Sequence, residues 1–471
     1  MKAEEYLTRG NTMMRQQETN AAVECYRRAI ALDPNCTQAY HNLGEALSQL
    51  QQWQEAITSY QFALKINPKQ AISHQRLGDT FVKCNHPERA IAAYQASLKL
   101  KPDSFQLNHQ VAQLLRQQGH LKQAIPYYFV AMKLQPFFQW SYWNLWEFLE
   151  QNQCLDDAVE LYQIARLSYP NAPLVELNLG ECLTQQGRLS EAIAAYRRSS
   201  YKKVQQKNPL LARQCWHEDG ALPPKFIIVG TQKGGTTSLY SYLIEHPQIL
   251  AAIKKEIHFW SHNYGYGLDW YLSHFPQLTN AEQPIFSGEA SPNYFEDDRV
   301  AARIHQVFPE MKLILLLRNP VNRAISQYHH WVRLGLERQP LATVMESEME
   351  QLSGYPHSVV RDIYWQTSSK YLWRGIYVVF LKHWLQFFPR EQLLVLKSED
   401  FYQNPAATLQ QVFEFLELPS FSSGEYQPHN QGTYPSIPDS VRVQLVNYFR
   451  PHNQVLEEFL GQEFAWDKSA L

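Results

Sequence analysis

Up to about residue 206, apolar positions recur with the helical period of about 3.6 residues, in pairs of segments separated by short polar joints. Residues 37–70 show one such pair, with the joint near Gln51 and Gln52, and this pattern predicts a helical hairpin. The pattern returns every 34 residues, with prolines at 34, 68, 102, 136 and 170, tyrosines at 26, 60, 94, 128, 162 and 196, and alanines at 22, 56, 90, 124, 158 and 192. We therefore expect six hairpins of one kind between residue 3 and about residue 206.

Each unit places small residues and one tyrosine where two packed helices need them. In residues 37–70, Gly44 and Ala56 allow the helices to approach closely. Tyr60 fills the groove between them, and Pro68 stops the second helix. The unit resembles the tetratricopeptide repeat, whose hairpins stack into an all-α superhelix. This resemblance implies a protein or peptide partner on the concave face, and a purely structural or dimerising role is the alternative.

From Lys225 onward, short continuous apolar runs replace the 34-residue pattern. The runs are FIIVG at 226–230, KLILLL at 312–317 and QLLVLK at 392–397, and helical patterns such as 406–418 alternate with them. Continuous apolar strands between helices predict an α/β domain with a parallel sheet, in which ligands bind at the carboxyl ends of the strands. The expected domains are the repeats at 1–206, a linker at 207–223 and the α/β domain at 224–471.

The composition is that of a globular protein, with 45% apolar and 19% charged residues and a net charge of −2. Because there is no basic excess, nucleic acid is not an expected partner. The N-terminus lacks the apolar core of a signal peptide, and no apolar run reaches the roughly 20 residues that span a bilayer. The six cysteines form no CxxC pair, which is typical of reduced thiols. We therefore expect a cytoplasmic protein without a membrane span.

The first predicted strand leads into the Gly-rich stretch GTQKGGTTS, residues 230–238. Glycines allow backbone N–H groups to turn inward, and a helix that starts near Thr237 would direct its positive end to the same place. Lys233 adds a full positive charge. The stretch therefore predicts an anion-binding loop, and an ordinary strand–turn–helix junction is the alternative.

This loop differs from the loops that bind ATP or GTP. Those loops follow the pattern G-x-x-x-x-G-K-S/T. Here Gly230 and Gly235 have the right spacing, but Thr236 occupies the lysine position. The sequence thus disfavours a nucleotide kinase and favours a polyanion of another kind.

A second candidate anion contact lies in KLILLLRNPVNRAIS, at the end of another apolar strand. Arg318 directly follows the apolar run, and Ser326 comes eight residues later, in the first turns of a helix that Pro320 can begin. An arginine at the end of a strand can bind phosphate through two parallel hydrogen bonds, and a serine hydroxyl can complete the contact. A surface arginine and an ordinary helical serine are the alternative.

Four stretches together resemble the sulfotransferases that use 3′-phosphoadenosine 5′-phosphosulfate (PAPS). KGGTTSL at 233–239 is similar to their 5′-phosphosulfate loop, and RNPVNRAIS at 318–326 is similar to their 3′-phosphate motif. KKEIHFW at 254–260 and the tail at 447–466 resemble the heparan-sulfate branch of the family. The resemblance covers about residues 222–468 and implies a P-loop-like sulfotransferase domain with a central parallel sheet.

The resemblance also implies a role for each motif residue. The 5′-phosphosulfate would be bound by Lys233, Gly234, Gly235, Thr236, Thr237 and Ser238, and the 3′-phosphate by Arg318 and Ser326. Lys233 would also neutralise charge on the leaving oxygen, and no metal is required. Glu256 would be the general base, with His258 as the alternative base or a substrate contact. Burial is expected to raise the pKa of Glu256, and the adjacent lysines are expected to lower it.

The resemblance leaves the acceptor open beyond its class, a hydroxyl or amine of a carbohydrate or glycoconjugate. GEASPNYF at 288–295 matches the stretch that lines the acceptor cleft of the family, so Ser291, Asn293 and Tyr294 are candidate contacts. The stretch at 429–436 lacks the Lys or Arg that the family has in a loop over the nucleotide. The alternatives are a protein-tyrosine sulfotransferase and a repeat scaffold with an inactive transferase domain.

Overall fold

The computed structural model describes residues 2–138, 145–217, 222–279, 284–333, 336–353, 371–422, 424, 426 and 437–466. The chain divides into two compact units, Met1–Ala165 and Arg166–Leu471. Each unit is described by itself. The stretch at 429–436, predicted to lack the usual basic residue over the nucleotide, lies outside the described residues.

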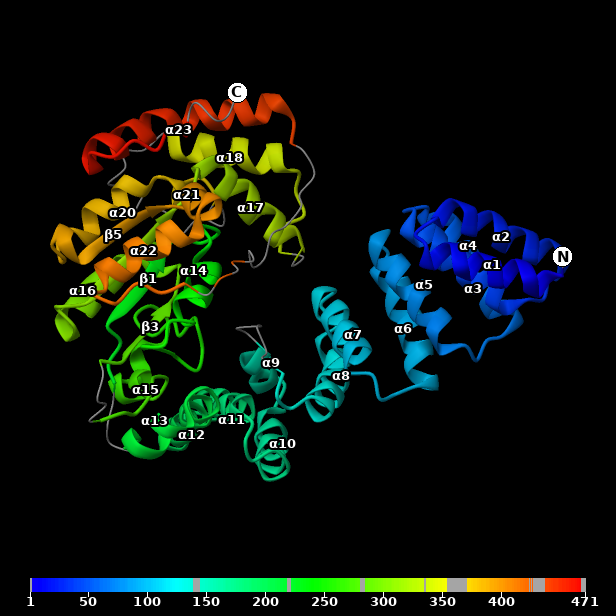
Figure 1. The fold of residues 1–471 in the computed structure, drawn as a ribbon, viewed down its shortest axis with the longest axis horizontal. Coiled ribbons are helices and arrows are strands. Elements are labelled where there is room, and N and C mark those ends of the chain that lie inside the picture. Colours follow the sequence, from blue (N-terminus) through cyan, green and yellow to red (C-terminus); the bar gives the residue numbers. More distant parts are fainter. Residues whose placement is uncertain are drawn as a thin grey trace. The chain divides into compact units, whose positions relative to one another are not determined.

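The described part of the first unit is a series of helices in antiparallel pairs (Figure 1). Its helices are α1 (Ala3–Arg15), α2 (Thr19–Leu32), α3 (Thr37–Gln49), α4 (Trp53–Ile66), α5 (Ala71–Lys83), α6 (Pro87–Leu100), α7 (Phe105–Gln117), α8 (Leu121–Leu134), α9 (Leu145–Gln151) and α10 (Leu155–Ser168), of which α10 continues past the unit boundary. The predicted helical repeats are therefore confirmed.

The constant spacing of glycine and tyrosine in four of the six hairpins has a steric cause. A Cβ atom added to Gly44 would lie 2.6 Å from the ring of Tyr60, which is 1% exposed, so only glycine leaves room for this ring. The same close approach occurs in the pairs Gly10–Tyr26, Gly78–Tyr94 and Gly180–Tyr196. The polar joints share a second feature, a positive φ at residues 17, 51, 85, 119, 153 and 187. Each joint thus reverses the chain through one left-handed residue.

The second unit begins with the sixth hairpin of this series. It consists of α11 (Pro173–Gln185) and α12 (Leu189–Lys207), and α13 (Pro209–Cys215) follows directly. The stretch expected as a linker, 207–223, thus contains a helix, and the sixth hairpin shares a compact unit with the sheet. The difference arises because α12 and α13 have apolar partners in the sheet domain, in a cluster that joins Val204 and Ala212 to Leu250 and Leu278.

A five-stranded parallel sheet forms the centre of the second unit (Figure 1). Its strands are β1 (Phe226–Gly230), β2 (Ile249–Ala251), β3 (Phe286–Ala290), β4 (Lys312–Leu317) and β5 (Leu393–Lys397), and their order is β2-β3-β1-β4-β5. All five residues of β1 are buried, because both faces of the central strands are covered. The predicted parallel sheet is confirmed, and the three apolar runs are β1, β4 and β5.

Helices surround this sheet. They are α14 (Thr236–Leu243), α15 (Leu268–Leu272), α16 (Asp298–Val307), α17 (Pro320–Arg333), α18 (Leu341–Ser353), α20 (Tyr377–Trp384), α21 (Ser398–Gln403), α22 (Pro405–Phe415) and α23 (Asp439–Leu460). A core of Ile228, Leu239, Ile314 and Val412 packs α14 and α22 against the strands. Among the described residues, no helix combines the length and the apolar character that crossing a membrane requires.

Candidate active site

The Gly-rich loop lies at the carboxyl end of β1, beside the end of β4. Thr231 N donates a hydrogen bond of 3.0 Å to Leu316 O, and a Cβ atom added to Gly234 would lie only 2.6 Å from the same oxygen. Gly235 has φ +103°, which an L side chain rarely adopts. Ser398 Oγ, at the start of α21, donates a 2.6 Å hydrogen bond to Gly234 O. The two glycines therefore allow a tight turn that is tied to both neighbouring elements.

Arg318 joins the two anion motifs that the sequence separates by 85 residues. Its Nη1 donates a hydrogen bond of 3.0 Å to Lys233 O. The hydroxyl of Tyr377 in turn donates to Arg318 O at 2.7 Å. Ser326, the predicted partner of Arg318, has a buried side chain on α17. The two motifs are thus in contact, as expected for loops that follow the carboxyl ends of adjacent parallel strands.

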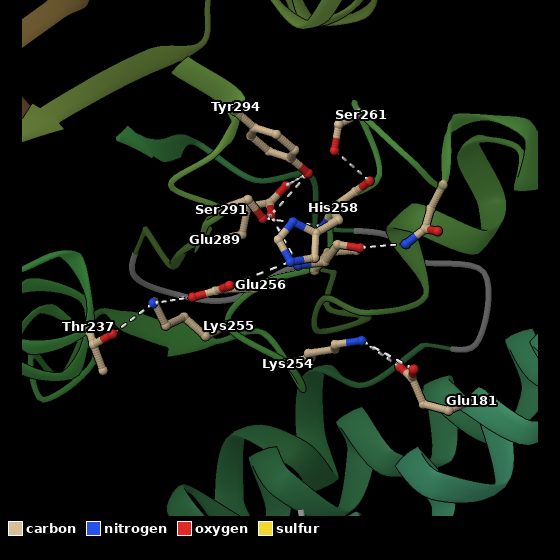
Figure 2. A network of polar contacts seen from close by, with 12 residues as sticks. Glu181, Thr237, Lys254, Lys255, Glu256, His258, Ser261, Glu289, Ser291 and Tyr294 are labelled. Carbon is tan, nitrogen blue, oxygen red and sulfur yellow. Dashed lines mark hydrogen bonds and ion pairs between the residues drawn. The ribbon is translucent and has the colours of Figure 1, made fainter. Parts of the chain in front are cut away.

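Lys255 connects the Gly-rich loop to the stretch KKEIHFW, residues 254–260, which we call the KKEIHFW segment. Its Nζ donates to Thr237 Oγ1 at 2.9 Å and to Glu256 Oε1 at 2.7 Å (Figure 2). Thr237 lies in the first turn of α14, where Thr236 and Ser238 are buried. Lys255 was not predicted as a connecting residue, because its place in a charged run does not indicate which groups its ammonium will contact.

Glu256 and His258 are neighbours within the KKEIHFW segment. His258 Nε2 lies 3.5 Å from Glu256 Oε2, and 40% of the Glu256 side chain is exposed. Partial burial acts to raise the pKa of Glu256, but hydrogen bonds and positive charge from His258 and Lys255 outweigh it and lower the pKa to about 2. Of the two opposing effects expected from the sequence, the cations therefore dominate. His258 Nδ1 is buried and has no hydrogen-bond partner among the described residues.

Lys233 and His258 share an uncommon backbone conformation. Their φ angles are +68° and +56°, in the left-handed region that residues other than glycine seldom occupy. The same conformation occurs at the polar joints of the repeat hairpins, so here it marks a tight local turn at each residue. Burial, together with the charges of Arg333 and Arg318, also lowers the pKa of Lys233 to about 8, although Glu256 acts in the opposite direction.

A buried carboxylate, Glu289, was missed by the sequence reasoning. It lies near the end of β3 and is fully buried. Its oxygens accept hydrogen bonds from Ser291 Oγ at 2.7 Å, from Tyr271 OH at 2.9 Å and from Tyr294 OH at 3.2 Å. Burial raises the pKa of Glu289, and these donors partly offset the effect. A glutamate inside the strand FSGEA was the available signal, since an apolar strand seldom buries a charge without a purpose.

The Glu289 network holds the backbone of the KKEIHFW segment through three hydrogen bonds. Glu289 accepts from Ile257 N at 3.4 Å, and Tyr294 OH accepts from Trp260 N at 3.3 Å. Ser291 Oγ accepts from His258 N at 3.3 Å (Figure 2). Ser291 and Tyr294, predicted as acceptor contacts, are fully buried. That prediction is corrected: these two side chains support the segment, and only Asn293 of the three keeps partial exposure.

Comparison with known proteins assigns both parts of the chain. Residues 223–433 match the sulfotransferase domain family, and residues 10–51, 37–70, 76–136 and 146–201 match tetratricopeptide repeat families. Residues 223–433 form a sulfotransferase domain. The predicted combination of repeats and a sulfotransferase enzyme is thereby confirmed. The sulfotransferase domain contains all the loop, strand-end and segment residues described above.

Individual relatives carry related names. The membrane-associated sulfotransferase kil1 of Dictyostelium discoideum is 29% identical over 57% of this chain and 72% of its own length. The human heparan sulfate glucosamine 3-O-sulfotransferase 3B1 is 31% identical over 52% of this chain and 65% of its own length. The crystal structure of a sulfotransferase from Alicyclobacillus acidocaldarius is 28% identical, with 52% of this chain and 99% of that chain covered and a TM-score of 0.42.

Proposed function

We propose that this chain transfers a sulfuryl group from PAPS to a hydroxyl or amine of a carbohydrate or glycoconjugate. The observation that carries the proposal is the polar connection through Lys255, which bonds both Thr237 of the Gly-rich loop and Glu256. This connection supports the proposal that a donor-binding loop and a proton acceptor belong to one site. Sulfuryl transfer, like phosphoryl transfer, depends mainly on such positioning and on electrostatic stabilisation.

The donor is assigned to the two connected anion motifs. The 5′-phosphosulfate would be bound by Lys233, Gly234, Gly235, Thr236, Thr237 and Ser238, and the 3′-phosphate by Arg318 and Ser326. Two observations support a fit. The loop contains two glycines that admit no side chain, and α14 begins directly after them, with the positive end of its dipole at the loop.

In the proposed reaction, Glu256 and Lys233 each have one task. The acceptor oxygen or nitrogen forms a bond to sulfur while the bond from sulfur to the bridging phosphate oxygen breaks. The proton of the acceptor goes to Glu256, and Lys233 offsets the negative charge on the leaving phosphate. The products are the sulfated acceptor and 3′-phosphoadenosine 5′-phosphate.

The low pKa of Glu256 is compatible with this role once the donor is bound. In the donor-free protein Glu256 is ionised at neutral pH, because its pKa is lowered to about 2. The negative charges of a bound donor would raise this pKa and make the carboxylate a stronger base. His258, at 3.5 Å, would orient Glu256.

The variant Glu256→Gln tests the assignment, because it removes the base and keeps the shape. Transfer of labelled sulfate from PAPS should fall by about 10²–10⁴-fold. Thermal protection by 3′-phosphoadenosine 5′-phosphate should remain and should exceed protection by ADP at equal concentration. Glu391→Gln, an exposed carboxylate just before β5 at the opposite edge of the sheet, is the matched control. Equal or better protection of the wild-type protein by ADP would end the PAPS proposal.

The acceptor class is inferred from the chemistry of the relatives. Several are named as heparan sulfate sulfotransferases, which supports a carbohydrate acceptor here. Offering labelled PAPS with polysaccharide, lipid and protein fractions separates the possibilities. Sulfate incorporated into tyrosine of the protein fraction alone would favour the protein-tyrosine alternative.

The repeats are proposed to bind a protein or peptide partner, or to recruit the acceptor, on their concave face. Their helical pairing supports this role, since such arrays commonly present extended binding surfaces. The cytoplasmic location suggested by the sequence remains a prediction.

A further inference from the structure

The sixth hairpin contacts the sulfotransferase domain at the start of the KKEIHFW segment. Glu181 on α11 accepts two hydrogen bonds from Lys254 Nζ, at 3.0 and 3.2 Å (Figure 2). Both side chains are largely covered, with 29% of Lys254 and 18% of Glu181 exposed. Ion pairs with little exposure are screened less than surface pairs, so this contact restrains the segment more than a surface pair would.

A second contact reaches the residue just before Lys254. Ile253 N donates a 2.9 Å hydrogen bond to His274 O, and the ring of His274 packs 4.2 Å from the ring of Tyr196 on α12. Next to it, Trp270 of α15 donates from Nε1 to Thr184 Oγ1 of α11 at 2.9 Å. Tyr196, Trp270 and His274 are almost completely buried. The joint between hairpin and domain is therefore a packed core, in which Trp270 Nε1 and His274 Nδ1 are hydrogen-bonded and His274 Nε2 is buried without a partner among the described residues.

A third contact reaches Ala252, the residue before Ile253. Lys203 Nζ of α12 donates a 2.6 Å hydrogen bond to Ala252 O. Three successive residues, 252, 253 and 254, are thus each fixed by the sixth hairpin, directly or through His274. The Glu289 network holds the backbone N–H groups of residues 257, 258 and 260, further along the segment. Lys255 and Glu256 lie between these two anchors.

We propose that the sixth hairpin is a positioning element of the sulfotransferase site and that Glu181 is its positioning residue. By holding Lys254, Glu181 sets where Lys255 and Glu256 stand relative to Thr237 and the Gly-rich loop. It also keeps the ammonium of Lys254 away from the carboxylate of Glu256, two residues along the chain. This inference rests on the role proposed above for Glu256, but the contacts themselves do not depend on it.

A double-mutant cycle on the full chain tests the pair. Glu181→Ala and Lys254→Ala should each lower kcat about tenfold to 100-fold, as small misplacements of reacting groups do. The kcat of the double variant should be no lower than that of the worse single variant, because the two side chains act as one pair. Affinity for 3′-phosphoadenosine 5′-phosphate should change less than about twofold, since the Gly-rich loop and Arg318 are untouched. Glu181→Gln, which keeps an acceptor atom, should fall between wild type and Glu181→Ala.

The control is Glu191→Ala, which removes an exposed ion pair with Arg188 inside the same hairpin. It should leave kcat unchanged. Amide hydrogen exchange gives a readout without turnover: exchange at residues 253–258 should rise in Glu181→Ala and stay at the wild-type rate in Glu191→Ala.

Two results would overturn the positioning role. One is an unchanged kcat and unchanged exchange in Glu181→Ala. The other is a parallel loss of kcat, nucleotide affinity and melting temperature, which would mean general destabilisation. If the wild-type chain transfers no sulfate and is not protected by 3′-phosphoadenosine 5′-phosphate, the proposed function fails instead, and the exchange result still decides whether Glu181 holds the segment.

Discussion

Lys233 carries its charge in surroundings that disfavour a charge. Its ammonium is partly desolvated and lies near Arg318 and Arg333, and its pKa is lowered to about 8 from an ordinary value of 10.5. A bound phosphosulfate would reverse this balance, because its negative charges favour the protonated lysine. The site is thus prepared for an anion at the residue that the mechanism places next to the breaking bond.

This shift predicts an alkaline limit for donor capture. Lys233 is protonated below about pH 8 in the donor-free protein and loses its charge as the pH rises through that value. The value of kcat/KM for PAPS, which reports groups of the free enzyme, should therefore fall above about pH 8. In Lys233→Arg the fall should move to higher pH, because a guanidinium stays charged. A fall at the same pH in the variant would assign the titration to another group.

The residues of the site divide by the kind of signal that each leaves in the sequence. Lys233, Arg318 and Glu256 stand in motifs of fixed spacing, so their meeting could be predicted. Glu289 and Lys255 lie within stretches that resemble the family, but no spacing assigns them a partner, and their partners are known only from distances in the folded chain. The direction in which the pKa of Glu256 moves likewise depends on those distances, since burial and neighbouring cations oppose each other.

At the scale of elements, one hairpin type serves two different environments. The Gly44–Tyr60 contact lies in the first unit, and the Gly180–Tyr196 contact lies in the second, where Tyr196 also packs on Trp270 and His274. The contact between glycine and tyrosine is therefore part of a repeat hairpin in the first unit, and in the second unit it is also part of the joint to the sulfotransferase domain.

A pair of identical substitutions separates these environments. In Gly180→Ala the new Cβ atom would lie 2.4 Å from the Tyr196 ring, and in Gly44→Ala it would lie 2.6 Å from the Tyr60 ring. Each should destabilise its own hairpin by about 1–3 kcal/mol through overpacking. Only Gly180→Ala should also reduce sulfate transfer to a small acceptor, because it disturbs the packing behind the KKEIHFW segment. Thermal unfolding and turnover of both variants check this, and equal losses of turnover would contradict it.

Three of the five strands were predictable from the sequence, whereas β2, β3 and the attachment of the sixth hairpin were not. FIIVG and KLILLL are continuous apolar runs, and such runs are typical of strands that are buried on both faces of a sheet. The 34-residue period describes how two helices pack on each other, and it contains no information about what lies on their outer side. Glu181 and Thr184 occupy ordinary repeat positions, so nothing in the period marks them as contacts to Lys254 and Trp270.

At the scale of the whole molecule, the boundary between the two compact units lies at residue 165, ahead of the sixth hairpin. All described contacts of the KKEIHFW segment come from the second unit. Removal of the first five hairpins and removal of all six should therefore have different effects on the sulfotransferase domain.

Two truncations test this boundary. A chain that begins after Ser168, where α10 ends, should fold and keep its thermal protection by 3′-phosphoadenosine 5′-phosphate. A chain that begins after Lys207 loses α11 and α12, exposes Trp270 and His274, and should unfold at lower temperature or aggregate. The measurements are melting temperature and nucleotide protection. Equal melting temperatures for the two truncations would show that the sixth hairpin is dispensable.

A left-handed residue lies at the polar joint of all six hairpins, and the Gly–Tyr contact recurs in the first, second, third and sixth. The sixth hairpin follows the same rule, and its contacts to residues 252 and 254 come from Lys203 and Glu181, at positions that the rule does not constrain. Surface residues of the first five hairpins could therefore be exchanged without altering these contacts, and the partner proposed for the repeats could be changed by design separately from the chemistry of the sulfotransferase domain.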